Sequence, residues 1–350
     1  MKKLLSIGLG VMLFMSSIGI SSANESINIS RVSGYDRYET AVNANKKFMD
    51  HANGNLAVIS SGSDFKTALY ASHMASALKV PYFVNPKHGV RTDILNEMQR
   101  LNVSRVYVVG NYKVLDRSVD NTLKSKGMKL QRIYQKNKES ILEGEIDNVI
   151  FRTFNSADAP RGDIGSLALV DDSKFPDLLS AAPFMGQLAR EQNIIMAGWR
   201  NYDSGEILED LGYIIGGYNS VPSNFKANFY TGYSEEEGCF LDYESKIDSR
   251  IYGQNRYETA VEIAKGYKTY LNKDINTIVL VNGEDYPDAL SSSLVATQNN
   301  GAVLLTQSNK LNKDTAKYIK DSGIKNIIIV GGEKSVSKSV ENELRNLYLK

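Results

Sequence analysis

The sequence predicts an α/β protein of three tandem repeat domains, each with a mostly parallel sheet flanked by helices. The first observation is a repeated segment, since residues 31–42 read RVSGYDRYETAV and residues 250–261 read RIYGQNRYETAV. The second is a series of short apolar runs that alternate with helical segments and show no period of two, as strands buried on both faces do. The third is a weaker copy of this series between the two clear copies, which indicates an internal repeat.

The repeated segment, called the opening motif (residues 31–42 and 250–261), predicts the start of a helix in both copies. Asp36 and Asn255 stand where an N-cap belongs, and Glu39 and Glu258 follow three residues later. This spacing is that of a capping box, in which cap and acid satisfy each other's backbone N–H groups. The apolar residues that follow fall on one helical face. We therefore expect each clear repeat to open with a capped helix.

The first and third copies contain the same expected elements in the same order. Their offset is 219 residues at the opening motif, from Arg31 to Arg250, and 221 residues from Gly62 to Gly283. A near-constant offset means that whole domains correspond to each other. The expected strands of the first copy are residues 56–60, 80–85 and 105–110, and those of the third copy are residues 277–281, 302–306 and 326–332, with helices between them.

The middle copy is degenerate. Residues 132–138 begin like an opening motif but lack its Gly, its Arg-Tyr pair and a correctly spaced Glu, whereas Phe175-Pro176-Asp177 matches Tyr286-Pro287-Asp288. The displacement from the first copy grows from 101 residues at Arg132 to 110 at Phe175, which predicts an insertion near residues 154–163. The predicted domains are residues 29–127 for repeat 1, 128–230 for the degenerate repeat 2, 231–247 for a linker and 248–350 for repeat 3.

The first 23 residues have the features of a secretory signal peptide. Lys2 and Lys3 form a basic start, an apolar stretch follows, and residues 21–23 form a small-residue cleavage site. A retained membrane anchor is the alternative, which the shortness of the segment and its Gly and Ser residues disfavour. No later stretch reaches the ~18 apolar residues that a membrane span needs. We therefore expect an exported chain with no membrane span after cleavage.

Charge and cysteine content narrow the function classes. The chain has 41 basic and 40 acidic residues, a balance that does not favour a nucleic-acid-binding protein. The single cysteine, Cys239, excludes an internal disulfide. A spare thiol in a loop is expected, with an intermolecular bridge as the alternative. The sequence makes no prediction about the oligomeric state.

Three such units behind a signal peptide, two of them opened by R-x-x-G-x-[DN]-R-Y-E-T-A, resemble the cell wall binding repeat 2 family of Gram-positive surface proteins. The resemblance extends from Arg31 to about Leu347. It implies a Toprim-like or Rossmann-like arrangement in each domain and a pseudo-threefold arrangement of the three. It further implies a secreted protein of the cell wall or cell surface. Such a protein attaches non-covalently, by multivalent binding of an anionic secondary cell-wall polysaccharide.

The resemblance also implies a polymer-binding strand of the Ile-Leu-Leu type that follows a Pro. The matching triplets are Val303, Leu304 and Leu305 in repeat 3, Tyr82, Phe83 and Val84 in repeat 1, and Ile194, Ile195 and Met196 in repeat 2. The triplet of repeat 3 is the one close to the pattern. Composition alone predicts that these are buried strands. If they contribute to binding, we expect them to shape a groove whose polar neighbours contact the polymer.

Arg37 and Arg256 are the candidate anion contacts of the two opening motifs. A guanidinium group matches carboxylate or phosphate, and both residues lie in the first turn of an expected helix, where free backbone N–H groups favour negative charge. The alternative is an ion pair with Glu39, Glu258 or a neighbouring domain. An expected strand ends in a glycine in every copy. Such a glycine indicates either that the chain turns away from the sheet or that its backbone binds a phosphate group. The three glycines are Gly110, Gly216 and Gly331.

Aromatic residues are further candidates for contact with sugars. The chain has 20 Tyr, and Trp199 and Tyr202 follow an expected strand of repeat 2. Exposed rings stack on sugar rings, while packing between domains is the alternative.

The sequence predicts no catalytic residue, metal site or cofactor. The three histidines lie in repeat 1 without metal-ligand spacing, and the Toprim-like carboxylate positions are not shared by the three copies. We therefore predict a binding protein without enzymatic activity. Two alternatives remain: a cell-wall hydrolase or modifier of an amidase, and a structural protein that covers the surface.

Overall fold

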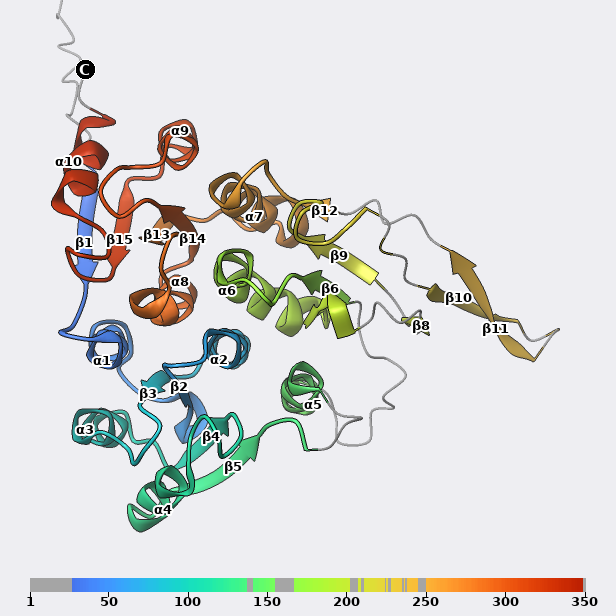
Figure 1. Ribbon diagram of the computed structural model, residues 1–350, viewed down its shortest axis with the longest axis horizontal. Coiled ribbons are helices and arrows are strands. Elements are labelled where there is room, and N and C mark those ends of the chain that lie inside the picture. Colours follow the sequence, from blue (N-terminus) through green and yellow to red (C-terminus); the bar gives the residue numbers. More distant parts are fainter. Residues whose placement is uncertain are drawn as a thin grey trace, which may run out of the picture.

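The computed structural model describes residues 27–136, 141–154, 167–201, 207–208, 211–223, 225, 228–234, 236, 238–244 and 250–348. These residues form three four-stranded sheets, each parallel throughout, and one smaller sheet (Figure 1). The predicted signal peptide, residues 1–23, lies outside the described residues. Within the described ranges, none of the helices is long and apolar enough to cross a membrane.

The first unit has the strand order β3-β2-β4-β5. Its strands are β2 (Leu56–Ser61), β3 (Tyr82–Asn85), β4 (Arg105–Val109) and β5 (Lys129–Ile133). Its helices are α1 (Arg37–Phe48), α2 (Phe65–Leu78), α3 (Thr92–Arg100) and α4 (Arg117–Ser125), with a short 3-10 turn at Asn53–Asn55. The strands and helices alternate as the sequence predicts.

The second unit has the strand order β12-β9-β6-β7. Its strands are β6 (Leu167–Val170), β7 (Ile195–Gly198), β9 (Leu211–Ile215) and β12 (Arg250–Ile251). Its helices are α5 (Leu142–Phe154) and α6 (Phe175–Gln192), and a 3-10 turn follows β7 at Trp199–Asn201.

An antiparallel hairpin extends away from the second unit (Figure 1). It consists of β10 (Asn228–Ser234) and β11 (Cys239–Glu244), and β8 (Ile207–Leu208) pairs with β10. The span predicted as a linker, residues 231–247, therefore contains most of a hairpin. The acidic run at residues 235–237, on which the linker prediction rested, falls between its two strands.

The third unit has the strand order β1-β15-β13-β14. Its strands are β1 (Asn28–Val32), β13 (Thr277–Asn282), β14 (Gly301–Thr306) and β15 (Asn326–Val330). Its helices are α7 (Arg256–Leu271), α8 (Ser292–Gln298), α9 (Lys313–Ser322) and α10 (Lys338–Asn346), and a 3-10 turn at Pro287–Ser291 leads into α8.

One strand of each parallel sheet comes from the segment that begins the next repeat around the ring. Strand β5 leads into repeat 2 and completes the first sheet, and β12 leads into repeat 3 and completes the second. The third sheet is completed by β1 from the opposite end of the chain, in register from Asn28 with Asn326 to Val32 with Val330 (Figure 1). The three units are thus joined in a closed ring.

The same clamp fixes the closing strand in all three sheets. A glycine with positive φ follows the central strand, and its N–H donates to the carbonyl of the last residue of the closing strand. Its own carbonyl accepts from an arginine of that strand. The N–H bonds are Gly110 to Ile133 at 2.8 Å, Gly216 to Ile251 at 3.0 Å and Gly331 to Val32 at 2.8 Å. The arginine bonds are Arg132 to Gly110 at 2.8 Å, Arg250 to Gly216 at 2.8 Å and Arg31 to Gly331 at 2.7 Å.

Three matching helices, α2, α6 and α8, meet at the centre of the ring (Figure 1). Close approach is possible because the facing side chains are small. Ser72 and Ser293 are joined by a hydroxyl hydrogen bond of 3.2 Å, and a Cβ on Gly186 would lie 2.6 Å from the Cβ of Ser76. At one end Phe65, Phe175 and Tyr286 form a ring of aromatic contacts, with centroids 5.6 to 6.4 Å apart. These matching contacts give the molecule its pseudo-threefold symmetry.

The clamp predicts that Gly331→Ala destabilises the fold. Gly331 has φ of 119°, and a Cβ there would lie 2.8 Å from Ser335 Oγ. We expect a loss of about 1 to 3 kcal/mol in the free energy of unfolding, measured by denaturant titration. Gly332→Ala is the matched control, because its Cβ would meet nothing within 4 Å. Equal stability of the two variants would contradict the clamp.

Candidate functional site

The nine residues of the predicted triplets lie on or beside the edge strands β3, β7 and β14, opposite the closing strands. All are buried, with at most 6% of their surface exposed: Tyr82, Phe83, Val84, Ile194, Ile195, Met196, Val303, Leu304 and Leu305. Helix α1 covers β3, and α6 and α7 cover β14. This burial favours the core role that the composition of the triplets indicates. A direct polymer contact stays a prediction.

Arg37 and Arg256 first serve the opening motif itself. Nη1 of Arg37 donates to the carbonyl of Gly62, and Nη1 of Arg256 donates to the carbonyl of Gly283 at 2.5 Å. Each arginine therefore ties the start of a helix to the end of a strand, a role that the sequence did not predict. Arg256 is exposed, whereas Arg37 is half-buried.

The N-caps predicted for both opening motifs are confirmed, while the return bond of each glutamate lies one residue earlier than in a capping box. Asp36 Oδ1 accepts from the N–H of Glu39 at 2.8 Å, and Asn255 Oδ1 accepts from the N–H of Glu258 at 3.0 Å. Each glutamate accepts in return from the residue before the cap, at 2.8 and 2.7 Å. The glycine of the motif is required by close approach, because a Cβ on Gly253 would lie 2.1 Å from the Cβ of Glu258. The opening motif is therefore a structural motif that also presents an arginine.

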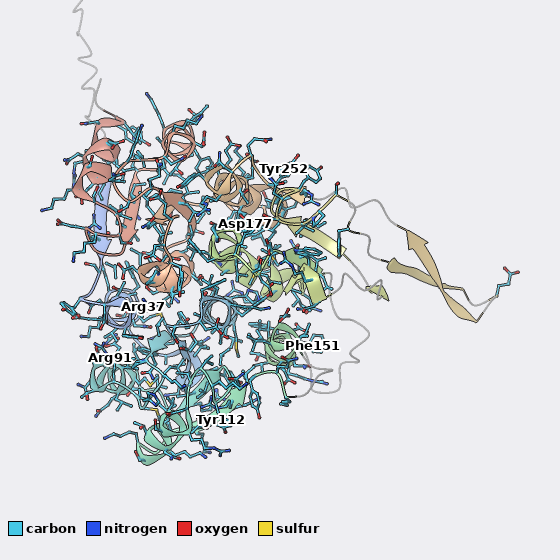
Figure 2. The ribbon with its side chains drawn as sticks, viewed as in Figure 1. Arg37, Arg91, Tyr112, Phe151, Asp177 and Tyr252 are labelled. Atoms are coloured by element: carbon cyan, nitrogen blue, oxygen red, sulfur yellow. The ribbon has the colours of Figure 1, made fainter. Side chains whose placement is uncertain are left out.

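A cavity of about 280 Å³ lies where the second and third units meet. It opens beside the residues that follow β9 and β12, and carboxyl ends of parallel strands are where ligands bind in open α/β sheets. The starts of α6 and α7 both border it, and the positive ends of the two helix dipoles favour a negatively charged ligand. Its ionisable and aromatic lining residues are Lys174, Asp177, Tyr218, Tyr252 and Arg256. Figure 2 shows Asp177 and Tyr252 at this junction.

Two cations and one acid set the charge of the cavity. Lys174 has 62% of its side chain exposed and lies 3.4 Å from Asp171 Oδ2. Asp177 accepts from the hydroxyl of Ser220 at 2.9 Å. Burial raises the pKa of Asp177, and the charge of Asp171 acts in the same direction, while Arg256 and Lys174 oppose the shift.

Tyr218 and Tyr252 form an aromatic surface beside these charges. Their rings meet edge to face with centroids 5.4 Å apart, and the guanidinium of Arg250 lies 4.5 Å from the centroid of Tyr218. Lys174 and both tyrosines were not predicted as site residues from the sequence. A signal was available, because Tyr218 stands two residues after the strand-ending Gly216 and Tyr252 two residues after Arg250.

The predicted aromatic candidate Trp199 is not on this surface. It is 8% exposed and packs edge to face on Phe225, with centroids 5.8 Å apart. Tyr202 lies outside the described residues. Among the residues that the structure describes, no group of three or more His, Cys, Asp or Glu side chains is placed to hold a metal ion.

Comparison with known proteins gives one family. The model of the family described as cell wall binding domain 2 matches residues 31–120 and 250–341. The chain is 23% identical over 342 residues to the N-acetylmuramoyl-L-alanine amidase LytC of Bacillus subtilis (strain 168), covering 97% of this chain and 61% of LytC. It is also 38% identical over 100 residues to the amidase enhancer of the same organism, covering 29% of this chain and 14% of the enhancer.

Two solved structures share the fold. Cwp6 from Clostridium difficile superposes with a TM-score of 0.67 over 93% of this chain and 48% of that protein. Cwp8 from the same organism superposes with a TM-score of 0.64 over 92% of this chain and 52% of that protein. Both are 17% identical to this chain.

The raised pKa of Asp177 predicts that Asp177→Asn stabilises the fold at pH 7. Below about pH 3.9, the ordinary pKa of Asp, the carboxyl is protonated in both folded and unfolded chains and has no such cost. As the pH rises through the folded pKa, the buried charge destabilises the folded state. Thermal denaturation at pH 7 and pH 3 measures this difference. We expect a higher midpoint for the variant at pH 7 and equal midpoints at pH 3.

Asp274→Asn serves as the control, because its side chain is 83% exposed and its pair with Lys268 contributes little. If the wild-type chain is as stable as Asp177→Asn at pH 7, the ionised carboxylate of Asp177 does not destabilise the folded state, which contradicts the prediction.

Proposed function

This chain belongs to the cell wall binding domain 2 family, and we propose that it attaches non-covalently to the cell wall by holding an anionic polysaccharide at the junction of its second and third units. The observation that carries the proposal is the cavity in which two helix starts, Lys174 and Arg256 surround the same space. Carboxylate or phosphate groups of a polymer suit both the cations and the positive ends of the two helix dipoles.

The aromatic side of the cavity supports a sugar as the anion's carrier. Tyr218 is 55% exposed, and a tyrosine ring offers an apolar face together with a polar hydroxyl. A free inorganic anion would use the cations alone. A charged sugar uses both the cations and the rings, so the combination favours an anionic polysaccharide.

Exposure of the cations makes the proposed binding weak at any single site and sensitive to salt. An extended polymer compensates, because one chain contacts several sites of the same rigid ring. Export to the cell surface is part of the proposal, since a wall polysaccharide lies outside the membrane. Polymer contacts by Arg37 and by the nine triplet residues stay predictions from the sequence. In the structure Arg37 donates to a backbone carbonyl and the triplets pack in the core.

The alternative of a wall hydrolase or a modifier of an amidase is favoured by the names of the two Bacillus relatives. The chain spans 61% of the length of LytC and 14% of that of the enhancer. Neither match assigns a catalytic role to a residue described above.

The proposal predicts that Lys174→Ala weakens binding to purified walls that retain their secondary polysaccharides. Loss of one exposed cation should lower the affinity roughly fivefold, measured by depletion of the protein from solution at low salt. Arg256→Ala should lower it at least as much. We expect the differences from wild type to shrink as salt is added.

Lys268→Ala is the matched control for charge. It removes one exposed cation from α7, the helix that begins at Arg256, at a position that does not line the cavity. Equal loss of affinity in this control and in Lys174→Ala would show that net charge, rather than the cavity, governs binding.

A further inference from the structure

Few large apolar side chains are exposed in the described part of the chain, and two of them occupy matching positions. The four are Tyr35, Tyr112, Phe154 and Tyr218. Tyr112 stands two residues after Gly110, and Tyr218 stands two residues after Gly216. The two tyrosines therefore sit beside the glycine clamps of two different junctions, with 37% and 55% of their surface exposed.

Both rings are supported in the same way. Arg132 lies 4.2 Å from the centroid of Tyr112, and Arg250 lies 4.5 Å from the centroid of Tyr218. These arginines belong to the closing strands and are held by two backbone carbonyls each. Arg132 donates to Gly110 and to Leu115 at 2.8 and 2.9 Å, and Arg250 donates to Gly216 and to Val221 at 2.8 and 3.0 Å. The rings are therefore fixed before any ligand arrives, which reduces the entropy lost on binding.

A second tyrosine, the residue just after the closing strand, completes each cluster. Tyr134 lies 6.3 Å from Tyr112, and Tyr252 lies 5.4 Å from Tyr218, measured between ring centroids. Further cations stand close by. Arg117 lies 4.5 Å from the centroid of Tyr112, while Lys174 and Arg256 line the cavity beside Tyr218. Asp120 pairs with Arg132 and accepts from the hydroxyl of Tyr112 at 3.4 Å, so Arg117 supplies the positive charge of the first cluster. Each cluster thus combines an exposed ring with a cation.

The third junction has the clamp without the aromatic cluster. Two residues after Gly331 stands Glu333, and the place of the second tyrosine is taken by Ser33. Arg31 pairs with Glu341 at 3.4 Å, as Arg132 pairs with Asp120 at the first junction, and Glu333 pairs with Lys338 at 3.2 Å. Asp285 stands where the second junction has Lys174. The acids Asp285 and Glu341 have counterparts at the first junction in Asp64 and Asp120, so the third junction differs from the first in lacking both tyrosines and in having Glu333 in place of the exposed ring.

The geometry points to two sugar-binding subsites, one on Tyr112 and Tyr134 and the other on Tyr218 and Tyr252, with the third junction of the ring left unused. This inference rests on the proposed function and names its subsites. Sugar rings of the anionic wall polysaccharide stack on the tyrosines, and their charged groups lie against Arg117 at one subsite and against Lys174 and Arg256 at the other. Figure 2 shows Tyr112 and Tyr252 far apart, so the polymer contacts the ring at two separate places.

Replacing the rings tests the two subsites separately. The probe is purified Gram-positive wall in two preparations, one that retains its secondary polysaccharides and one from which they have been extracted. On retaining walls, Tyr112→Leu and Tyr218→Leu should each bind roughly three- to tenfold more weakly than wild type. The double variant should lose at least a further tenfold, because avidity is lost with the second subsite. Tyr112→Phe and Tyr218→Phe keep the ring and should bind within about twofold of wild type.

Tyr35→Leu is the matched control. Tyr35 is 98% exposed and lies three residues beyond β1, at the third junction. It should bind as wild type does. Leu variants of Tyr112 and Tyr218 that bind like wild type, or a Tyr35→Leu variant that is equally weakened, would overturn the inference. The proposed function fails in a different way, namely if wild type binds the extracted walls as strongly as the retaining ones.

A second readout uses the unmodified protein and does not depend on the folding of any variant. Nitration of tyrosines by tetranitromethane, followed by mass spectrometry, reports which rings the polymer covers. Retaining walls should protect Tyr112 and Tyr218 and leave Tyr35 reactive. Protection of Tyr35 to the same degree, or unprotected Tyr112 and Tyr218, would contradict two subsites.

Discussion

The pairing of β1 with β15 is the interaction on which the rest of the structure depends. It joins residues that are 298 positions apart, and it gives the third sheet the same closing strand that β5 and β12 give the other two. Each closing strand brings an arginine to the carbonyl of a glycine. Two of these arginines also support an exposed tyrosine. The clamps of the first two junctions and the proposed binding surfaces therefore use the same residues.

The opening motif of repeat 3 links the ring to the cavity between the second and third units. Its glycine, cap and glutamate fix the start of α7, and Arg256 ties that start to the carbonyl of Gly283, just after β13. The first turn of α7 then faces the start of α6 across the cavity. A sequence motif that is structural in itself thereby sets the position of a cation in the proposed site. The central helices hold the three units at fixed distances, so the two subsites lie on one rigid body.

Much of the fold could be predicted because its signals are local. Capping residues, apolar runs and strand-ending glycines act within a few positions. Each of these signals occurs in both clear repeats, so each element was predicted twice. Ring closure could not be predicted, since no local pattern shows that β1 pairs with β15. The nine triplet residues carried a family expectation of binding, yet they lie on covered edge strands. The tyrosine clusters were missed because their two tyrosines lie 22 and 34 positions apart, and because the third copy has Glu333 and Ser33 at the matching positions.

Hydrogen exchange of the β1 backbone, measured in the intact chain by NMR or mass spectrometry, tests ring closure most directly. The N–H of Asn28 donates to the carbonyl of Lys325 at 2.7 Å, and residues 28–32 run in register with 326–330. A closed ring predicts that β1 amides bonded to β15 are protected to the same degree as the amides of β13 in the same sheet. Rapid exchange throughout β1, with β13 still protected, would show an open ring and contradict this central claim.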